Sequence, residues 1–202
     1  MTTIINYNLG NPKSIKNMLA YLGIESRISA NNSDIVSADR LILPGVGHFQ
    51  HGMEQLEQLG LVEVLKKEVL ENKKSILGIC LGMQLMTKHS EEGNLVGLDF
   101  IDAQTKKFEL HDKNLKVPHM GWNTVSFQKV SKLNENISEN SRYYFVHSYY
   151  VECSNQEDIL CTTNYGTDFV SGFQHNNIFG LQFHPEKSHK FGMELLNNFC
   201  KL

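Results

Sequence analysis

Short apolar runs alternate with helix-forming segments through the first 90 residues, and this alternation constrains the fold more than any other feature of the sequence. Strand-like runs occupy residues 2–8, 24–29, 38–45 and 74–80. Helices are predicted between and after them, at 12–22, at about 50–71 with a break near Gly60, and at 81–88. Asn11 and Pro12 supply an N-cap and a first-turn proline for the first helix, which Gly23 closes. Buried strands that alternate with helices are typical of right-handed βαβ units on a parallel sheet.

The second half of the chain is rich in strands. They are predicted at residues 117–127, 142–153, 159–165 and 169–183, the last being a hairpin that turns at Asn176 and Asn177. Within 142–153, alternation would place Tyr143, Phe145, His147 and Tyr149 on one face. A final helix is predicted over 188–202. We therefore expect a single α/β domain over residues 1–202, with a mostly parallel sheet early and antiparallel strands late.

The charge balance excludes several classes of partner. The chain has 19 Lys and Arg against 22 Asp and Glu, a net charge of −3, and no run of five like charges. It therefore lacks the electrostatic footprint of a protein that binds nucleic acid or a membrane surface. No apolar stretch approaches the length of a membrane span, and the first residues do not resemble an export signal. We expect a cytoplasmic protein with neither nucleic acid nor membrane as a partner.

One of the four cysteines stands at a special position. The four show neither C-x-x-C pairing nor close spacing to histidine, so we expect no metal, and nothing indicates a cofactor. Cys80 lies between Gly78 and Gly82, where a predicted strand turns into a helix. This arrangement is typical of a nucleophile elbow. In such an elbow a tight turn exposes the nucleophile, and the start of the helix offers N–H groups to a thiolate or an oxyanion. The alternative for any cysteine, a small buried side chain, is expected for Cys153, Cys161 and Cys200.

A nucleophilic cysteine needs a base and a group that orients the base. His184 and Glu186 follow an apolar strand and stand two residues apart, so on an extended chain they would point the same way, and Pro185 ends the strand. The alternative is a solvated histidine and glutamate at a strand end. Other histidines in polar surroundings are expected at the surface: His51, His89, His111, His175 and His189.

Two further segments have open interpretations. Residues 44–47, Pro-Gly-Val-Gly, follow a predicted strand and would emerge at the same sheet edge as Cys80. Their glycines would let a backbone N–H turn inward as a second oxyanion donor, although an ordinary turn is the alternative. Trp122 lies in an irregular run that contains Pro118 and Gly121, and either a core position or a contact surface suits it.

Five motifs together resemble those of the class I, triad-type glutamine amidotransferases. In chain order they are PGVGHF (44–49), GICLGMQL (78–85), PHMGWN (118–123), YYFVHSYY (143–150) and GLQFHPEKS (180–188). PHMGWN and FVHSYY resemble the branch formed by the glutaminase subunits of imidazole glycerol phosphate synthases. The similarity runs from the first predicted strand to the last helix. It implies a flavodoxin-like α/β domain that hydrolyses L-glutamine and supplies ammonia to a synthase in histidine biosynthesis.

The resemblance also implies roles for the matched residues. Cys80 would attack the glutamine carboxamide, His184 would act as general base and then as acid, and Glu186 would orient the imidazole. The residues implied for the oxyanion hole are Val46, Gly47 and Leu81. Those implied around glutamine are Gly47, Gln84, His147, Ser148 and Tyr149.

The partner in the family is a cyclase built on a (β/α)₈ barrel, with which the chain would form a heterodimer. The interface residues implied by the same matching are Asn11, Trp122, Tyr144 and Lys187. Lys187 would be a candidate for an ion pair with the cyclase. One departure is visible, because residues 6–10, Asn-Tyr-Asn-Leu-Gly, stand where relatives often have Asp-Tyr-Gly-x-Gly. This difference concerns the shape of the interface loop and not the chemistry.

The same sequence features are compatible with two other functions. A paralogous glutaminase that feeds another synthase, such as one that amidates a surface sugar, would carry the same motifs because the partner chooses the acceptor. A non-catalytic redox or binding protein on the same scaffold would use a reactive Cys80 without a triad. The presence of both His184 and Glu186 argues against this second alternative.

Overall fold

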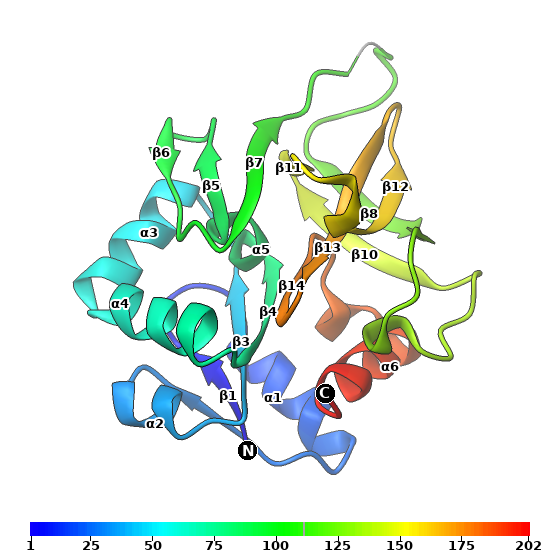
Figure 1. Ribbon diagram of the computed structural model, residues 1–202. Coiled ribbons are helices and arrows are strands. Elements are labelled where there is room, and N and C mark those ends of the chain that lie inside the picture. Colours follow the sequence, from blue (N-terminus) through cyan, green and yellow to red (C-terminus); the bar gives the residue numbers. More distant parts are fainter. Residues whose placement is uncertain (111) are drawn as a thin grey trace.

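A mixed sheet crosses the protein, and its parallel part has the strand order of a flavodoxin-like fold. The computed structural model describes residues 1–110 and 112–202. The parallel strands, in their spatial order, are β2 (Ser26–Ser29), β1 (Thr2–Ile5), β3 (Arg40–Gly45), β4 (Ser75–Cys80) and β14 (Ile178–Leu181) (Figure 1). This order corresponds to the flavodoxin-like order 2-1-3-4-5, whose ligands bind beyond the carboxyl ends of the strands.

Antiparallel strands extend the sheet beyond β14. They are β13 (Asp168–His175), β11 (Tyr149–Cys153), β7 (Ile101–Lys107), β5 (Thr87–Ser90) and β6 (Leu95–Val96), with β12 (Ile159–Asn164) and β9 (Ser126–Phe127) attached at the side. Within this group, β5 and β7 run parallel to each other. A separate antiparallel pair joins β8 (His119–Thr124) to β10 (Arg142–His147). The predicted α/β fold with a mostly parallel central sheet and later antiparallel strands is confirmed.

Helices cover both faces of the central sheet, and each face has its own apolar core. The α-helices are α1 (Pro12–Tyr21), α2 (Asn32–Val36), α3 (Phe49–Gln58), α4 (Leu61–Lys66), α5 (Leu81–Leu85) and α6 (His189–Phe199). The other helical segments are η1 (Lys67–Glu71), a π-helical turn that follows α4, and three 3₁₀ turns, η2 (Lys132–Asn134), η3 (Gln156–Asp158) and η4 (Pro185–Lys187). Figure 1 shows α3 and α4 on one side of β3 and β4, with α1 and α6 on the other. Alternation along β3 follows this division, because Leu41 and Leu43 pack with α3 and α4 whereas Ile42 packs with α1 and α6.

The predicted starts and stops of several elements are confirmed. The Asn11 side chain accepts a hydrogen bond from the Ser14 N–H at 3.2 Å, as expected of an N-cap. Gly60, with a φ of 65°, separates α3 from α4. The hairpin of β13 and β14 turns at Asn176 and Asn177, since His175 pairs with Ile178.

The helix predicted over 81–88 is too long. It ends at Leu85, and Thr87 begins β5 instead. Thr87 pairs with Ile101 of β7, and its hydroxyl lies 3.2 Å from the hydroxyl of Thr105. Pairing with a strand some 15 residues later along the chain therefore overrides the local helical pattern, an ordinary outcome for a β-branched residue.

The single strand predicted over 142–153 is two strands. Ser148 interrupts it, so β10 pairs with β8 in the small sheet and β11 pairs with β7 and β13 in the large one. Tyr149 therefore does not continue the face of Tyr143 and Phe145, which are fully buried, whereas Tyr149 is half-buried. The break has a consequence for function, because it brings residues 146–149 over the end of β4.

Among the described residues, no helix is both long and apolar enough to span a membrane. Within residues 1–110 and 112–202, no three His, Cys, Asp or Glu side chains gather as a metal site would require.

The close approach of α5 to β3 leads to a prediction about stability. A Cβ atom added at Gly82 would lie 1.8 Å from the Leu43 carbonyl oxygen, a backbone atom that cannot move aside without shifting β3. Gly82→Ala should therefore lower the free energy of unfolding by about 3 kcal/mol. Gly52→Ala is the matched control, because a Cβ there would meet the flexible ends of two side chains, Leu85 at 3.0 Å and Leu81 at 3.4 Å. The control should stay within about 1 kcal/mol of the unsubstituted chain in urea unfolding followed by circular dichroism. Equal stability of the two variants would contradict this account of the packing.

Candidate active site

Cys80 sits on a strained turn between β4 and α5. Its φ of 54° and ψ of −109° lie outside the regions that residues with side chains ordinarily adopt. The two flanking glycines make the turn possible, because a Cβ on Gly78 would lie 2.7 Å from the Gly82 carbonyl oxygen and one on Gly82 would collide with β3. The geometry is that of the elbow expected from the sequence. Because α5 spans only Leu81 to Leu85, the field of the helix at Cys80 is smaller than a longer helix would give.

His184 and Glu186 form a buried pair beside this cysteine. The imidazole Nδ1 lies 2.8 Å from the Glu186 Oε1, and the two side chains are only 1% and 3% exposed. The backbone of His184 is held as well, since its N–H donates to the Tyr144 carbonyl at 2.9 Å. The alternative of a solvated histidine and glutamate is therefore wrong.

The surroundings of His184 favour its protonated form. Burial alone would lower the pKa of the imidazole, but the nearby Cys80 sulfur and the Glu186 carboxylate outweigh burial and raise that pKa to about 9. At neutral pH the ring is therefore an imidazolium. A cation beside a cysteine favours the thiolate, which is the nucleophilic form of the side chain.

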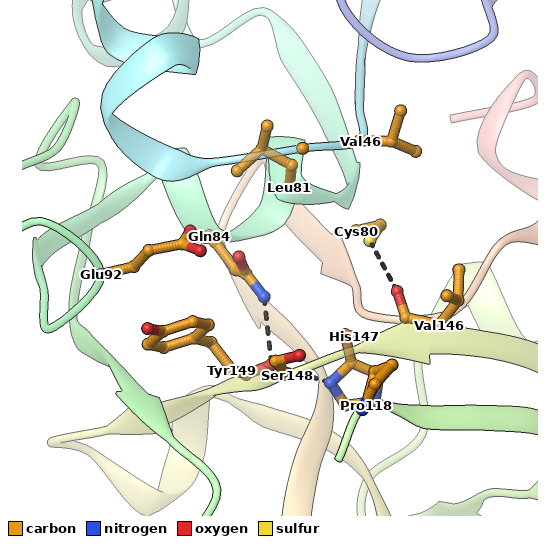
Figure 2. Close-up of a pocket in the computed structure, with 11 residues that line it drawn as sticks. Val46, Cys80, Leu81, Gln84, Glu92, Pro118, Val146, His147, Ser148 and Tyr149 are labelled. Carbon is orange, nitrogen blue, oxygen red and sulfur yellow. Dashed lines mark hydrogen bonds between the residues drawn. The ribbon is translucent and has the colours of Figure 1, made fainter.

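A cavity of about 280 Å³ opens next to Cys80. Its lining comes from the loop after β3, the elbow, the turn after β5 and the segment between β10 and β11 (Figure 2). The lining residues are Val46, Gly47, Cys80, Leu81, Gln84, Glu92, Pro118, Val146, His147, Ser148 and Tyr149. All the residues that the sequence suggested for the oxyanion hole and the glutamine site thus lie around one cavity, together with Cys80.

Two residues of the loop after β3, Val46 and Gly47, line this cavity. Gly47 has a φ of 112°, a conformation that suits glycine, and Val46 is 40% exposed. The loop is also in contact with the N-terminal segment, because a Cβ added at Gly10 would lie 3.1 Å from the Gly45 nitrogen. In that segment Asn8 adopts a φ of 66° and its side chain donates to Gln55 at 2.8 Å. The unusual Asn8 therefore takes up the left-handed conformation that glycine would otherwise supply.

Hydrogen bonds hold the opposite wall of the cavity. The Gln84 side-chain amide donates to the Tyr149 carbonyl at 3.1 Å and to the Gln182 side chain at 3.0 Å. The His147 Nδ1 also lies 2.7 Å from the Tyr149 carbonyl, and its Nε2 lies 3.0 Å from a nitrogen of His119. Both nitrogens of His147 are thus engaged within the protein. His147 therefore forms part of the cavity wall.

The structure also brings together three of the four residues suggested for a partner interface. Tyr144 pairs with Trp122 across β10 and β8, with their rings 6.3 Å apart, and the Lys187 Nζ lies 5.6 Å from the Tyr144 ring centre. Trp122 is 40% exposed, so it is a surface and not a core residue. Asn11 is exposed at the start of α1, and α1 contacts the Pro185–Lys187 turn. This cluster, in which Trp122 and Lys187 are exposed and Tyr144 is half-buried, adjoins the backbone of His184.

Two residues near the cavity were not found from the sequence. Glu92 is the single carboxylate among the described residues that line the cavity, and the Phe49 N–H at the start of α3 donates to it at 2.8 Å. Gln182 is fully buried, and its amide donates to the Cys80 sulfur at 3.7 Å. Glu92 lies in a polar run that reads as an ordinary turn, and Gln182 interrupts an apolar strand. The polar residue inside that apolar strand was the one available signal.

Among the residues that the structure describes, the histidines and two of the remaining cysteines lie as expected, whereas Cys200 is half-buried and not fully buried. Burial raises the pKa of both Cys153 and Cys161 to about 12, and it raises that of Cys200 as well. The histidines predicted at the surface are exposed or half-buried at His51, His89, His175 and His189. His111 lies outside the described residues.

Comparison with known proteins agrees with this geometry. A family model described as glutamine amidotransferase class-I matches residues 3–202. The chain is 54% identical to "Imidazole glycerol phosphate synthase subunit HisH 2" of Methanococcus maripaludis over 100% of this chain and 99% of that protein. It is 48% identical to the subunit of the same name from Pseudomonas aeruginosa, over 100% of both chains.

Solved structures support the fold. The structure of PurLQS from Thermotoga maritima superposes with a TM-score of 0.73 at 16% identity, covering 99% of this chain and 97% of that one. A glutamine amidotransferase crystal structure gives a TM-score of 0.71 at 16% identity, covering 96% and 98%. With the family match over nearly the whole chain and relatives near half identity, the chain belongs to the class-I glutamine amidotransferase family.

Proposed function

We propose that this chain is the glutaminase subunit of an imidazole glycerol phosphate synthase, and that residues 1–202 act as one catalytic domain. The observation that carries the proposal is the buried pair of His184 and Glu186 beside Cys80, at the edge of a cavity of about 280 Å³. The names of the relatives at 54% and 48% identity supply the assignment to this synthase. The reaction takes L-glutamine and water to glutamate and ammonia.

In the first half of the reaction, the Cys80 sulfur attacks the carboxamide carbon of glutamine and a C–S bond forms. The negative charge that develops on the carbonyl oxygen is stabilised by the N–H of Leu81 and by a backbone N–H of the Val46–Gly47 loop. When the C–N bond breaks, the protonated His184 gives its proton to the leaving nitrogen, which departs as ammonia. This role suits a ring whose pKa is about 9, because the proton is present at neutral pH.

In the second half, water hydrolyses the thioester. The neutral His184 accepts a proton from the water as it attacks the acyl carbon, and the C–S bond breaks to release glutamate and restore the Cys80 thiolate. Glu186 holds the Nδ1 side of the ring throughout, so the Nε2 side stays directed at the reacting atoms. The His184 Nε2 has no hydrogen-bond partner among the described residues, which leaves it available for this proton transfer.

The Glu92 carboxylate supplies a means of recognising the amino-acid end of the substrate. The α-ammonium of glutamine is cationic, and a partly buried carboxylate held by the backbone at the start of α3 would pair with it. Gln84, Ser148 and Tyr149 would line the remaining path between that group and Cys80. A substrate held at both ends presents its carboxamide to the thiol in a defined orientation.

The partner in this proposal is the cyclase subunit, built on a (β/α)₈ barrel, in a cytoplasmic heterodimer. The cluster of exposed Trp122 and Lys187 around the half-buried Tyr144, together with Asn11, is the docking surface we assign to it. Aromatic side chains are frequent anchors in protein interfaces. Because the backbone of Tyr144 also bonds to His184, a partner seated here would lie close to the site that releases ammonia.

A second candidate function rests on the relatives' names. The subunits from Methanococcus maripaludis and Pseudomonas aeruginosa are both numbered 2, and one from Campylobacter jejuni is numbered 1. Numbered names indicate more than one such subunit in an organism, and a second copy is free to serve another acceptor. A paralogous glutaminase that supplies ammonia to a different synthase, such as one amidating a surface sugar, is therefore the second candidate. The chemistry at Cys80 is the same in both.

Mixing the purified chain with the cyclase subunit and its ribotide should raise ammonia release from glutamine by about 10²–10³-fold. This is the gain expected if one oxyanion hydrogen bond is presented only in the complex. Ammonia is measured with a coupled dehydrogenase assay. Cys80→Ala in the same complex should lose at least about 10³-fold, because no thioester can form, whereas Cys153→Ala should retain full activity. Activity that survives in Cys80→Ala would refute the proposed chemistry. Glutaminase activity that the cyclase leaves unchanged would instead favour the second candidate.

Glu92→Gln should raise the KM for glutamine by about tenfold or more and change kcat little. The amide keeps a hydrogen-bond acceptor for the Phe49 N–H but loses the charge that pairs with the α-ammonium, and a bond to a charged group contributes about 1.5–3 kcal/mol. Glu91→Gln is the matched control, because Glu91 is exposed and bonds to the Lys107 backbone outside the cavity lining. Steady-state kinetics with glutamine measures both variants. Equal KM values for the two would remove Glu92 from substrate recognition.

A further inference from the structure

Two buried histidines touch each other behind the cavity wall. His119 on β8 and His147 at the end of β10 are 3% and 6% exposed, and the His119 Nδ1 lies 3.0 Å from the His147 Nε2. Burial lowers the pKa of His119 to about 4 and, together with the neighbouring rings of His119 and His184, lowers that of His147 to about 3. Both rings are therefore neutral at physiological pH, and each carries one N–H.

The Tyr149 carbonyl, which lies beside His147, determines which nitrogen of each histidine ring carries the proton. The Tyr149 carbonyl can only accept, so the His147 Nδ1, 2.7 Å away, must be the donor. A neutral His147 then has an acceptor at Nε2, so the proton of His119 lies on Nδ1 and points to His147.

The hydrogen bonds of Asn123, on the far side of His119, agree with this assignment of protons. The Asn123 Oδ1 accepts from the Thr124 N–H at 2.8 Å, and its amide nitrogen donates to the Asn164 carbonyl at 2.9 Å. This orientation leaves the amide nitrogen facing the His119 Nε2 at 3.4 Å. That nitrogen must accept, in agreement with a proton on Nδ1. The donors therefore run in one direction, from Asn123 through His119 and His147 to the Tyr149 carbonyl.

This series of hydrogen bonds from Asn123 to the Tyr149 carbonyl forms a relay, and the relay ends at the cavity. The Tyr149 carbonyl also accepts from the Gln84 amide at 3.1 Å, and Gln84, His147 and Tyr149 all line the cavity beside Cys80 (Figure 2). The segment it anchors is the break at Ser148, where the chain leaves the small sheet and enters the large one. At this break the Phe108 N–H donates to the Ser148 carbonyl at 3.2 Å, and the side chains of His147 and Gln84 hold the next carbonyl, that of Tyr149.

We propose that His119 is a positioning residue for glutamine, which acts through His147 on the segment of Ser148 and Tyr149. His119 itself does not line the cavity, and its effect on substrate passes through the single bond from its Nδ1 to His147. The inference rests on the proposed function, since it assigns that segment to the glutamine site. It adds a residue of β8, a strand whose Met120 and Trp122 are exposed at the surface, to the machinery of that site.

Two substitutions separate the hydrogen bond from the aromatic packing of His119. The ring stacks on Tyr165 with centres 4.0 Å apart and on Phe145 at 4.8 Å. His119→Phe keeps an aromatic ring and loses the N–H, whereas His119→Asn loses the ring and keeps an N–H at the position of Nδ1. Glutaminase kinetics in the presence of the cyclase subunit and its ribotide, together with thermal melting of each variant, compare the two.

His119→Phe should raise the KM for glutamine about 3- to 12-fold, the equivalent of one buried hydrogen bond, and change kcat less than about twofold. His119→Asn should stay within about twofold of the unsubstituted chain in both constants, even if it melts at a lower temperature. A normal KM in His119→Phe, or an equal rise in both variants, would overturn the proposal, because packing and not the bond would then be responsible.

A measurement without turnover tests the relay separately. Nitrogen-15 NMR of histidine-labelled protein at pH 7 should show both His119 and His147 as neutral rings protonated at Nδ1. Protonation at Nε2 on either ring would overturn the relay. If the unsubstituted chain hydrolysed no glutamine with any partner, the proposed function would fail while this spectrum still reported on the relay, so the two failures are distinguishable.

Discussion

The buried pair of His184 and Glu186 is the interaction on which the rest of the site depends. Two side chains that are 1% and 3% exposed can carry charge only if each compensates the other, because an unpaired buried charge is strongly unfavourable. The pair is placed by β14, which runs parallel to β4 with Leu181 beside Ile79. His184 follows Leu181 by three residues, and Cys80 directly follows Ile79. The central parallel strands thus bring together a cation and a thiol from distant parts of the chain.

The second constraint is steric and acts on the backbone. The β4–α5 turn holds Cys80 in a strained conformation, and it persists because Gly82 packs against the Leu43 carbonyl with no room for a side chain. The same packing places the loop after β3 next to the elbow. Cys80, the N–H of Leu81 and the backbone of Val46 and Gly47 therefore border one cavity without any contribution from the later antiparallel strands. Those strands supply the opposite wall, through residues 146–149.

Features encoded by local pattern could be predicted from the sequence, and features that depend on distant pairing could not. The βα alternation and the elbow glycines around Cys80 are local, and the structure agrees with both. His184 and Glu186 do meet, but through the 3₁₀ turn of Pro185–Lys187 and not on the extended chain that was expected. Local periodicity predicts a helix at Thr87, because its pairing partner in β7, Ile101, lies too far along the chain to affect a local pattern. The sequence does not reveal the break at Ser148, because residues 143–150 show the two-residue alternation of a single strand without interruption. Glu92 and His119 carry no local mark, since only the assembled sheet brings them to the cavity or to His147.

The pKa of His184 tests most directly whether the buried pair and the thiol form one unit. Because the folded-state pKa of about 9 lies above the ordinary value of 6.5, the stabilisation from the protonated ring is fully present below about pH 6.5 and is lost as pH rises through about 9. Nitrogen-15 NMR titration should therefore show the His184 ring protonated at pH 7.5, with a midpoint near pH 9. In Glu186→Gln and Cys80→Ala the midpoint should fall, because burial then dominates. A midpoint at or below 6.5 in the unsubstituted chain would contradict the account.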